Sequence, residues 1–296
     1  MNHIDLFSGI GGFALAAKQH GIKTTDFVEC EPHLQRVIKK HWPDSTIHKD
    51  IINYKPLKNV FLVTGGFPCQ DISRANTTTK KGGIDGTRSG LWTEYFRVLR
   101  ESRPKYCIIE NVYDLLSNGI GRILQNLAEI GYDSTWTVID SQYTGVPQRR
   151  RRVYILGVRD GISDNSDIFE CAKRSAIRKQ IEHIANCRRE EIKKAEKSGF
   201  GFFSFQRSDE YKKSAVASTI KKCGWSMGGD FVVTNNLVSY LTVGEKLALQ
   251  GIDELHTENC GLDSRQLHTA NGMTIPAVAW VIEKMMNYEK KQNENT

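Results

Sequence analysis

The chain has 296 residues, a formal net charge of +7 and a sequence pI near 9.0. That length allows one large domain or two ordinary ones, and the positive charge favours an anionic partner, with nucleic acid ahead of a membrane surface or an acidic protein. No apolar run approaches the roughly 20 residues of a membrane span and no signal peptide is recognisable, which predicts a cytoplasmic protein. The seven cysteines form no Cys-x-x-Cys pair, so neither a disulfide framework nor a zinc site is supported.

A glycine-rich turn follows the first predicted strand. Residues 3–7 predict a strand, residues 8–12 (Ser-Gly-Ile-Gly-Gly) a turn, and residues 13–20 a helix. Glycines at such a position let backbone amides crowd a ligand at a helix start, as in nucleotide sites. An ordinary tight turn is the alternative, because a Gly-x-Gly-Gly sequence alone is a weak signal.

Carboxylates follow the next two predicted strands. A strand over 25–28 ends at Glu29, about 20 residues after the glycines, where an acid that binds ribose hydroxyls is usual. A helix is expected over 33–41 and a short strand around 46–48. The next carboxylate, Asp50, is a candidate for contact with an adenine amino group, with a simple turn residue as the alternative.

The most informative stretch is V-F-L-V-T-G-G-F-P-C-Q-D-I-S over 60–73. We expect a buried strand that delivers the Cys69 thiol to the end of a sheet, where open α/β folds keep their chemistry. The alternative is that Cys69 is one more small buried hydrophobic residue. The turn favours the first interpretation, because Pro68 stiffens the backbone before the sulfur while Gly65 and Gly66 let a ligand approach closely.

The segment after Cys69 is polar and rich in glycine. Over 74–90 we expect a mobile loop whose basic residues close over phosphates. A helix is predicted over 91–102 and a strand over 106–109, which ends at Glu110. Glu110 is a second reactive candidate because it follows a run typical of a buried strand, and a surface carboxylate is the alternative.

Four adjacent arginines, Arg149 to Arg152, follow a predicted helix over 119–130 and a predicted strand over 134–139. In an extended chain Arg150 and Arg152 share one side with Tyr154, while Arg149 and Arg151 point the other way. Such a run is ordinarily solvated. Because it leads directly into an apolar strand over 153–158, we expect some of these arginines to be held at a site.

The composition changes from residue 160 onward. A long helix with a basic outer face is expected over 167–198. Residues 199–240 mix aromatic and basic residues with glycines, which fits loops that reach a nucleic acid and a small β core equally well. Helical patterns return over 242–250 and 275–288, and the polar tail from residue 290 is expected to fray.

Four segments, in this order, resemble the DNA (cytosine-5)-methyltransferases of prokaryotes and phages: D-L-F-S-G-I-G-G-F at 5–13, G-G-F-P-C-Q-D-I-S at 65–73, E-N-V at 110–112 and Q-R-R-R-R-V at 148–153. The resemblance implies an α/β fold with a Rossmann-like, S-adenosylmethionine-dependent methyltransferase domain over 1–160 and 262–296. It also implies a smaller inserted target-recognition domain over 161–261. The cofactor contacts it implies are Phe7, Gly9, Gly11, Gly12, Glu29, Cys30, Asp50, Ile51, Pro68, Leu91 and Asn271.

The resemblance also implies the chemistry. Cys69 would add to carbon 6 of cytosine, Glu110 would hold or supply a proton at ring nitrogen 3, and Arg152, with Arg150, would bind oxygen 2. The expected partner is duplex DNA with the target base flipped out, and no metal is implied. We expect a nucleoid-associated monomer of a modification system, and leave open whether a restriction enzyme acts separately. The alternatives are methylation of transfer RNA and a catalytically silent DNA-binding regulator.

Overall fold

The computed structural model describes residues 1–68, 91–162, 168–169, 201–205, 211–214, 217, 231–234, 237–260 and 273–294. Cys69, the expected loop over 74–90, Asn271 and, apart from 168–169, the expected helix over 167–198 lie outside the described residues. The chain divides into two compact units. The first comprises Met1–Ile139, Arg151–Cys171 and Val278–Thr296, and the second Asp140–Arg150 and Ala172–Ala277.

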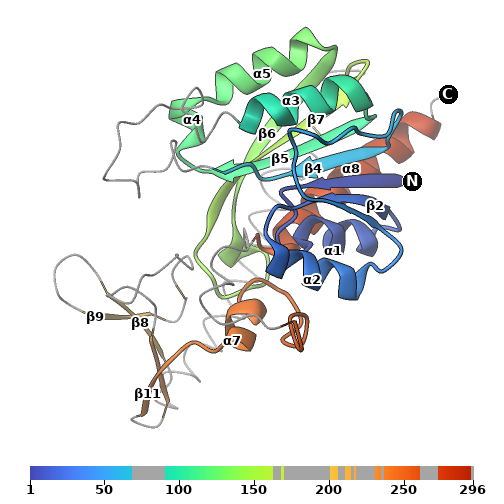
Figure 1. Cartoon of the computed structure of the whole chain (residues 1–296). Coiled ribbons are helices and arrows are strands. Elements are labelled where there is room, and N and C mark those ends of the chain that lie inside the picture. Colours follow the sequence, from blue (N-terminus) through green and yellow to red (C-terminus); the bar gives the residue numbers. More distant parts are fainter. Residues whose placement is uncertain are drawn as a thin grey trace. The chain divides into compact units, whose positions relative to one another are not determined.

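The first unit is built on a seven-stranded sheet with the order β3-β2-β1-β4-β5-β7-β6 (Figure 1). Strands β1 to β5 pair in parallel, and β7 pairs antiparallel to β5. The strand order reverses between β1 and β4, and open α/β sheets bind ligands at the carboxyl ends of the strands flanking such a reversal. The strands are β1 Asn2–Leu6, β2 Lys23–Val28, β3 Thr46–His48, β4 Leu62–Gly65, β5 Tyr106–Val112, β6 Tyr132–Asp140 and β7 Arg151–Arg159.

Helices cover both faces of this sheet, with α3, α4 and α5 on one face and α1, α2 and α8 on the other (Figure 1). All four residues of β4 are buried, as expected for a strand covered on both sides. A large core of aliphatic and aromatic side chains fills the space beneath α3 to α5. The helices are α1 Gly12–Gln19, α2 Pro32–His41, α3 Leu91–Ser102, α4 Leu115–Asn118, α5 Ile120–Glu129 and α8 Ile275–Glu294.

A polar network crosses the centre of the sheet. Nδ1 of His3 lies 2.8 Å from Thr24 Oγ1, and its Nε2 lies 2.7 Å from Thr64 Oγ1, which donates to Asp5 Oδ1 at 3.4 Å. These side chains are buried. Burial lowers the pKa of His3 to about 3 and raises that of Asp5 well above its ordinary value. The network therefore joins β1, β2 and β4 through a neutral imidazole.

The helix expected over 91–102 is confirmed as α3, but several elements run further than their sequence patterns predict, among them β5 and α8. Strand β5 continues through Val112, so Glu110 lies within the strand and not after it, because β7 pairs along its whole length. Helix α8 continues to Glu294 where a frayed tail was expected. Its Glu289 carboxylate accepts from Lys105 Nζ at 2.7 Å and from the Tyr106 hydroxyl at 2.5 Å, which ties this end of the helix to the sheet.

The second unit contains an antiparallel four-stranded sheet with the order β11-β10-β8-β9. Its strands are β8 Gly201–Phe205, β9 Tyr211–Ser214, β10 Phe231–Thr234 and β11 Leu237–Tyr240. A short helix follows, α7 Val243–Ala248, which starts at a capping box between Thr242 and Glu245. A small β-sheet is thus present within 199–240, and contact of this region with nucleic acid stays a prediction.

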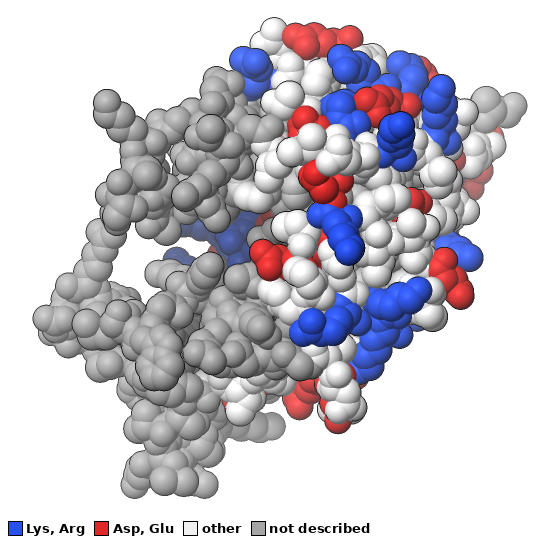
Figure 2. Space-filling model, viewed as in Figure 1, with Lys and Arg blue, Asp and Glu red and all other residues white. Residues whose placement is uncertain are grey.

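Charges on the described part of the first unit are mixed. Figure 2 shows lysines and arginines interspersed with aspartates and glutamates over the visible face of this unit. The net charge of +7 is therefore not displayed as a single basic surface on this face. Among the helices that the structure describes, none combines the length and apolar character needed to cross a bilayer.

Candidate active site

The glycine-rich turn at the end of β1 contains three residues with left-handed backbone. Phe7, Gly9 and Gly11 have φ angles of 53°, 58° and 84°. A Cβ atom on Gly11 would lie 2.5 Å from the ring of Trp42, so this position requires glycine both for its backbone and for its neighbour. Helix α1 begins at Gly12, which places the free amides of a helix start at the carboxyl end of β1.

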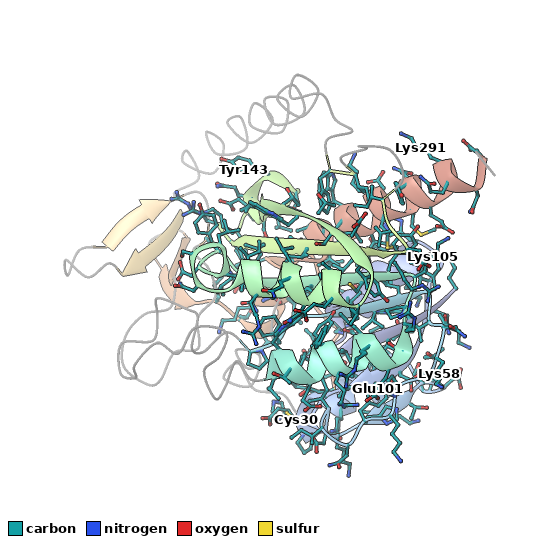
Figure 3. All side chains as sticks on the ribbon, turned by 90° about the horizontal axis from the view of Figure 1, so that it is seen from above. Cys30, Lys58, Glu101, Lys105, Tyr143 and Lys291 are labelled. Carbon is teal, nitrogen blue, oxygen red and sulfur yellow. The ribbon has the colours of Figure 1, made fainter. Side chains whose placement is uncertain are left out.

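Glu29 follows β2 and is held against this turn. Its Oε2 accepts from the Gly9 amide at 2.7 Å and its Oε1 accepts from the Glu31 amide at 2.9 Å. The side chain is buried, and burial raises its pKa. Each carboxylate oxygen has a further lone pair for a donor such as a ribose hydroxyl. Cys30 is exposed beside it (Figure 3), and its pKa is raised by partial burial and by the carboxylates of Glu29 and Glu31.

Asp50 and Ile51 follow β3 at the same edge of the sheet. The Asp50 carboxylate accepts from the Ile52 amide at 2.9 Å and from Asn53 Nδ2 at 2.7 Å. Ile51 is buried, whereas Leu91, the first residue of α3, is half-buried. The left-handed turn, the buried Glu29 and these residues together suit a nucleoside-bearing cofactor, because they offer amides, acceptors and apolar surface along one sheet edge.

The structure brings together two residues predicted as catalytic. Nε of Arg152 lies 3.0 Å from Oε1 of Glu110, and the two side chains are 15% and 10% exposed. In the antiparallel register Glu110 faces Tyr154 and Val112 faces Arg152, so the ion pair is diagonal on one face of β5 and β7. A buried carboxylate is thereby held in a fixed direction by a guanidinium.

The turn that leads to Cys69 packs against this carboxylate. A Cβ atom on Gly66 would lie 2.7 Å from Oε2 of Glu110, so the glycine admits Glu110 where the sequence suggested close approach of a ligand. Asn111 Nδ2 donates to the Phe67 carbonyl at 3.3 Å. Pro68, which follows Phe67, is half-buried and is the last described residue before Cys69. Asn111 thus fixes the turn to β5, a role that its place in the Glu-Asn-Val motif did not reveal.

The four arginines alternate as predicted. Arg150 and Arg152 are buried and half-buried, whereas Arg149 and Arg151 are exposed, and the Arg151 guanidinium lies 4.8 Å from the centre of the Tyr113 ring. Arg150 belongs to the second unit, where its amide donates to Asp140 Oδ1 at 3.1 Å. A role for Arg150 at the base stays a prediction.

Comparison with known proteins identifies the family of this chain. Residues 1–285 match the family model described as C-5 cytosine-specific DNA methylase. The chain belongs to this family. The resemblance seen in the sequence is thereby confirmed, and with it the cofactor, because this family uses S-adenosylmethionine.

Two curated relatives are Type II methyltransferases of bacteria. The chain is 38% identical to M2.BsuMI of Bacillus subtilis (strain 168) over 164 residues, which cover 53% of this chain and 41% of that protein. It is 28% identical to M1.ScrFI of Lactococcus lactis subsp. cremoris over 317 residues, which cover 98% of this chain and 79% of that protein. The match therefore spans less than half of the first relative and most of the second.

Solved structures share the fold. The S. pombe Dnmt2 methyltransferase superimposes with a TM-score of 0.66 at 15% identity and covers 95% of this chain and 97% of its own. A putative DNA modification methyltransferase encoded within an E. coli prophage superimposes with a TM-score of 0.64 at 16% identity, with coverage of 98% and 99%. These likenesses confirm the predicted α/β fold.

Proposed function

We propose that this chain transfers a methyl group from S-adenosylmethionine to carbon 5 of cytosine within a specific sequence of duplex DNA. The observation that carries the proposal is the Glu110–Arg152 ion pair beside Gly66, in the turn that leads to Cys69. The family match supports the reaction class. Glu29, Asp50 and the glycine turn at the ends of β1 to β3 are the proposed cofactor site.

The residue types suit the chemistry. Carbon 5 of cytosine is a poor nucleophile, so the Cys69 thiolate would bond to carbon 6 while Glu110 holds a proton at ring nitrogen 3. Carbon 5 of the resulting enamine would take the electrophilic methyl group that the cofactor supplies. The bond between that methyl group and the sulfonium sulfur would break, with S-adenosylhomocysteine as the leaving group. Loss of the carbon 5 proton to a base then returns an electron pair to the ring and expels the Cys69 sulfur. Arg152 would orient Glu110 and bind oxygen 2 of the base.

The target base must leave the helix for this to happen. Carbon 6 is stacked inside a duplex, so we propose that the enzyme flips the cytosine into the site. Residues 74–90 would close behind the base, and residues 161–261 would carry target recognition. We propose that the enzyme acts as a monomer, with or without a separate restriction enzyme.

The deciding experiment measures transfer of labelled methyl groups to unmethylated genomic DNA and to transfer RNA, followed by bisulfite sequencing of the labelled product. Labelling of cytosine in one short DNA context is expected. Labelling of transfer RNA alone would mean that the same reaction takes place on transfer RNA and not on DNA. No labelling of either would favour the silent DNA-binding regulator.

Two variants test the covalent mechanism. Cys69→Ala should abolish transfer while the protein still folds and binds DNA, and turnover by this variant would remove Cys69 as the nucleophile. Glu110→Gln should slow the chemical step much more than it weakens cofactor binding. A duplex that contains 5-fluorocytosine should trap the wild-type chain covalently and leave Cys69→Ala free, because fluorine blocks loss of the carbon 5 proton.

A further inference from the structure

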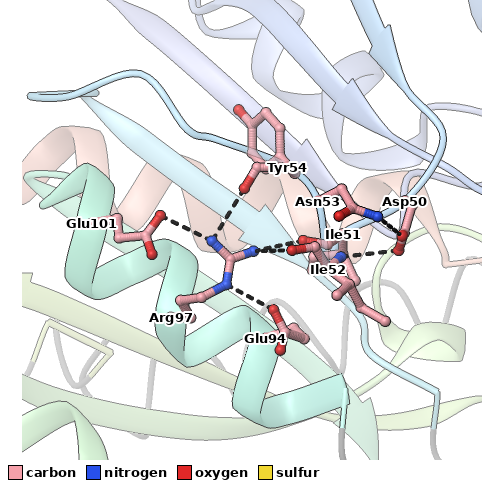
Figure 4. A network of polar contacts seen from close by, with 8 residues as sticks. All are labelled: Asp50, Ile51, Ile52, Asn53, Tyr54, Glu94, Arg97 and Glu101. Atoms are coloured by element: carbon pink, nitrogen blue, oxygen red, sulfur yellow. Dashed lines mark hydrogen bonds and ion pairs between the residues drawn. The ribbon is translucent and has the colours of Figure 1, made fainter.

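Arg97, in the middle of α3, joins the helix to the segment that follows β3. Its Nη2 donates to the Ile51 carbonyl at 2.6 Å and to the Ile52 carbonyl at 3.4 Å, and its Nη1 donates to the Tyr54 carbonyl at 3.1 Å (Figure 4). The side chain is 21% exposed. The guanidinium therefore binds three backbone carbonyls of a segment that forms no helix or strand.

Two carboxylates of α3 fix the guanidinium for this task. Glu94 Oε2 accepts from Arg97 Nε at 2.7 Å and Glu101 Oε2 accepts from Nη1 at 2.9 Å. Because these glutamates lie one turn before and one turn after Arg97, they hold its planar fork toward the loop. A lysine offers a single charged point in place of this fork, so it would not reproduce the three carbonyl contacts.

One peptide group connects Arg97 with Asp50. The carbonyl of Ile51 and the amide of Ile52 belong to the same planar unit. Its oxygen accepts from Arg97 at 2.6 Å, and its N–H donates to Asp50 Oδ1 at 2.9 Å (Figure 4). Arg97 therefore orients the Ile51 carbonyl, and the rigid peptide group passes this orientation to the Asp50 carboxylate at its opposite edge.

We propose that Arg97 is a positioning residue for the adenine end of S-adenosylmethionine. It holds the 51–52 peptide group so that the Asp50 carboxylate keeps the direction needed to accept from the adenine amino group. Its helix also starts at Leu91, so the same side chain ties together two segments proposed to contact the cofactor. This inference rests on the proposed function, because it takes Asp50 as an adenine contact.

The chain offers a matched control. Arg100 lies three residues further along α3 and lines, with Arg97, Lys58 and Glu101, a surface groove of about 800 Å³. Arg100 is exposed, and among the described residues it has no hydrogen bond or ion pair to the loop. Arg100→Gln therefore removes the same charge from the same helix without touching the carbonyl contacts.

The test compares the affinities of the full chain for S-adenosylhomocysteine and S-inosylhomocysteine by titration calorimetry. The second ligand carries an oxygen in place of the adenine amino group, so it disfavours a carboxylate partner. Arg97→Gln should weaken the adenosyl ligand about 10-fold, the equivalent of one lost charged hydrogen bond, and reduce the preference over the inosyl ligand. Arg97→Lys should lose much of the same preference, and Arg100→Gln none.

A double variant separates positioning from general loosening. If Arg97 acts through Asp50, Arg97→Gln combined with Asp50→Asn should bind little worse than Asp50→Asn alone. Additive losses, or an unchanged preference in both Arg97 variants, would overturn the inference. Arg97→Lys keeps a charge between Glu94 and Glu101, so it provides a folded variant if Arg97→Gln does not fold.

Ligand binding requires no methyl transfer, which keeps the two proposals apart. An inactive chain that shows the expected binding pattern would overturn the proposed function and leave the role of Arg97 standing. A wild-type chain that prefers neither ligand would remove Asp50 as the adenine contact, and the role of Arg97 with it.

Discussion

Arg152 and Glu110 form an ion pair between two antiparallel strands, with 3.0 Å between Nε and Oε1. Both side chains are largely withdrawn from solvent. Removal of one partner from such a pair leaves the other charge buried and unpaired, which is costly in free energy. The geometry of the pair, and the turn at Gly66 packed on it, lead to the first two predictions.

Arg152→Gln should slow single-turnover methyl transfer at saturating DNA by about 10²-fold or more, because it removes the cation that fixes Glu110 and that we propose to bind oxygen 2 of the base. The control is Arg151→Gln, which removes the neighbouring exposed arginine on the opposite side of the strand. Its rate at saturating DNA should stay near the wild-type value. Equal losses in both variants would point to overall charge and not to the ion pair.

Gly66→Ala should displace the Glu110 carboxylate, because the added methyl group would lie 2.7 Å from Oε2. We expect a slower chemical step with little change in affinity for S-adenosylhomocysteine. Gly121→Ala on α5 is the control, since a Cβ there meets nothing within 4 Å and alanine favours a helix. A Gly66→Ala enzyme with wild-type single-turnover rates would show that the carboxylate does not need this space.

The buried His3 should make stability depend on pH. Its pKa is lowered to about 3 in the fold, so between pH 6.5 and that value the unfolded chain binds the extra proton. His3 therefore does not reduce the free energy of unfolding above pH 6.5. Below pH 6.5 this group lowers the free energy of unfolding by up to about 1.4 kcal/mol for each unit that the pH decreases. Denaturant melts should show a shallower acid slope in His3→Gln. Identical slopes would contradict a neutral buried imidazole.

Asp5 contributes with the opposite sign. Burial raises its pKa, so the folded chain holds the proton more tightly, and this contribution is present at low pH and is lost as the pH rises above about 3.8. The comparison of His3→Gln with wild type cancels the part of this contribution that both proteins share. Melts of Asp5→Asn and of the double variant His3→Gln/Asp5→Asn complete a cycle that measures the part that depends on His3.

Glu289→Ala should destabilise the fold by about 1–3 kcal/mol, because it removes one ion pair and one charge-assisted hydrogen bond that hold the end of α8. Figure 3 shows Lys105 close to this helix. Glu283→Ala on the same helix is the control, since Glu283 is exposed. Urea unfolding would measure the loss of stability in each variant. Equal losses in Glu289→Ala and Glu283→Ala would show that the contacts of Glu289 do not explain the change.

Much of the proposed site was predictable because the ends of strands are determined by residues close together in the sequence. A run of strand formers followed by glycine, or by a single carboxylate, indicates where the chain leaves a sheet, and this pattern located the glycine turn, Glu29 and Asp50. The same pattern selected Glu110 but placed it after the strand, whereas it lies within β5. The alternation of Arg149 to Arg152 likewise follows from the two-residue period of a strand. The motifs around Cys69 and Glu110 then identified the family.

The sequence by itself thus identified the family and the residues that we propose to carry the chemistry. Only the tertiary structure decided how they meet. The pairing of Glu110 with Arg152 depends on the register of β7 against β5, and the need for glycine at position 66 depends on that pair. The contacts of Arg97 could not be predicted from the sequence, because a charged residue on a helix is ordinarily expected to be solvated. Its partners are backbone carbonyls of residues more than 40 positions away in the chain.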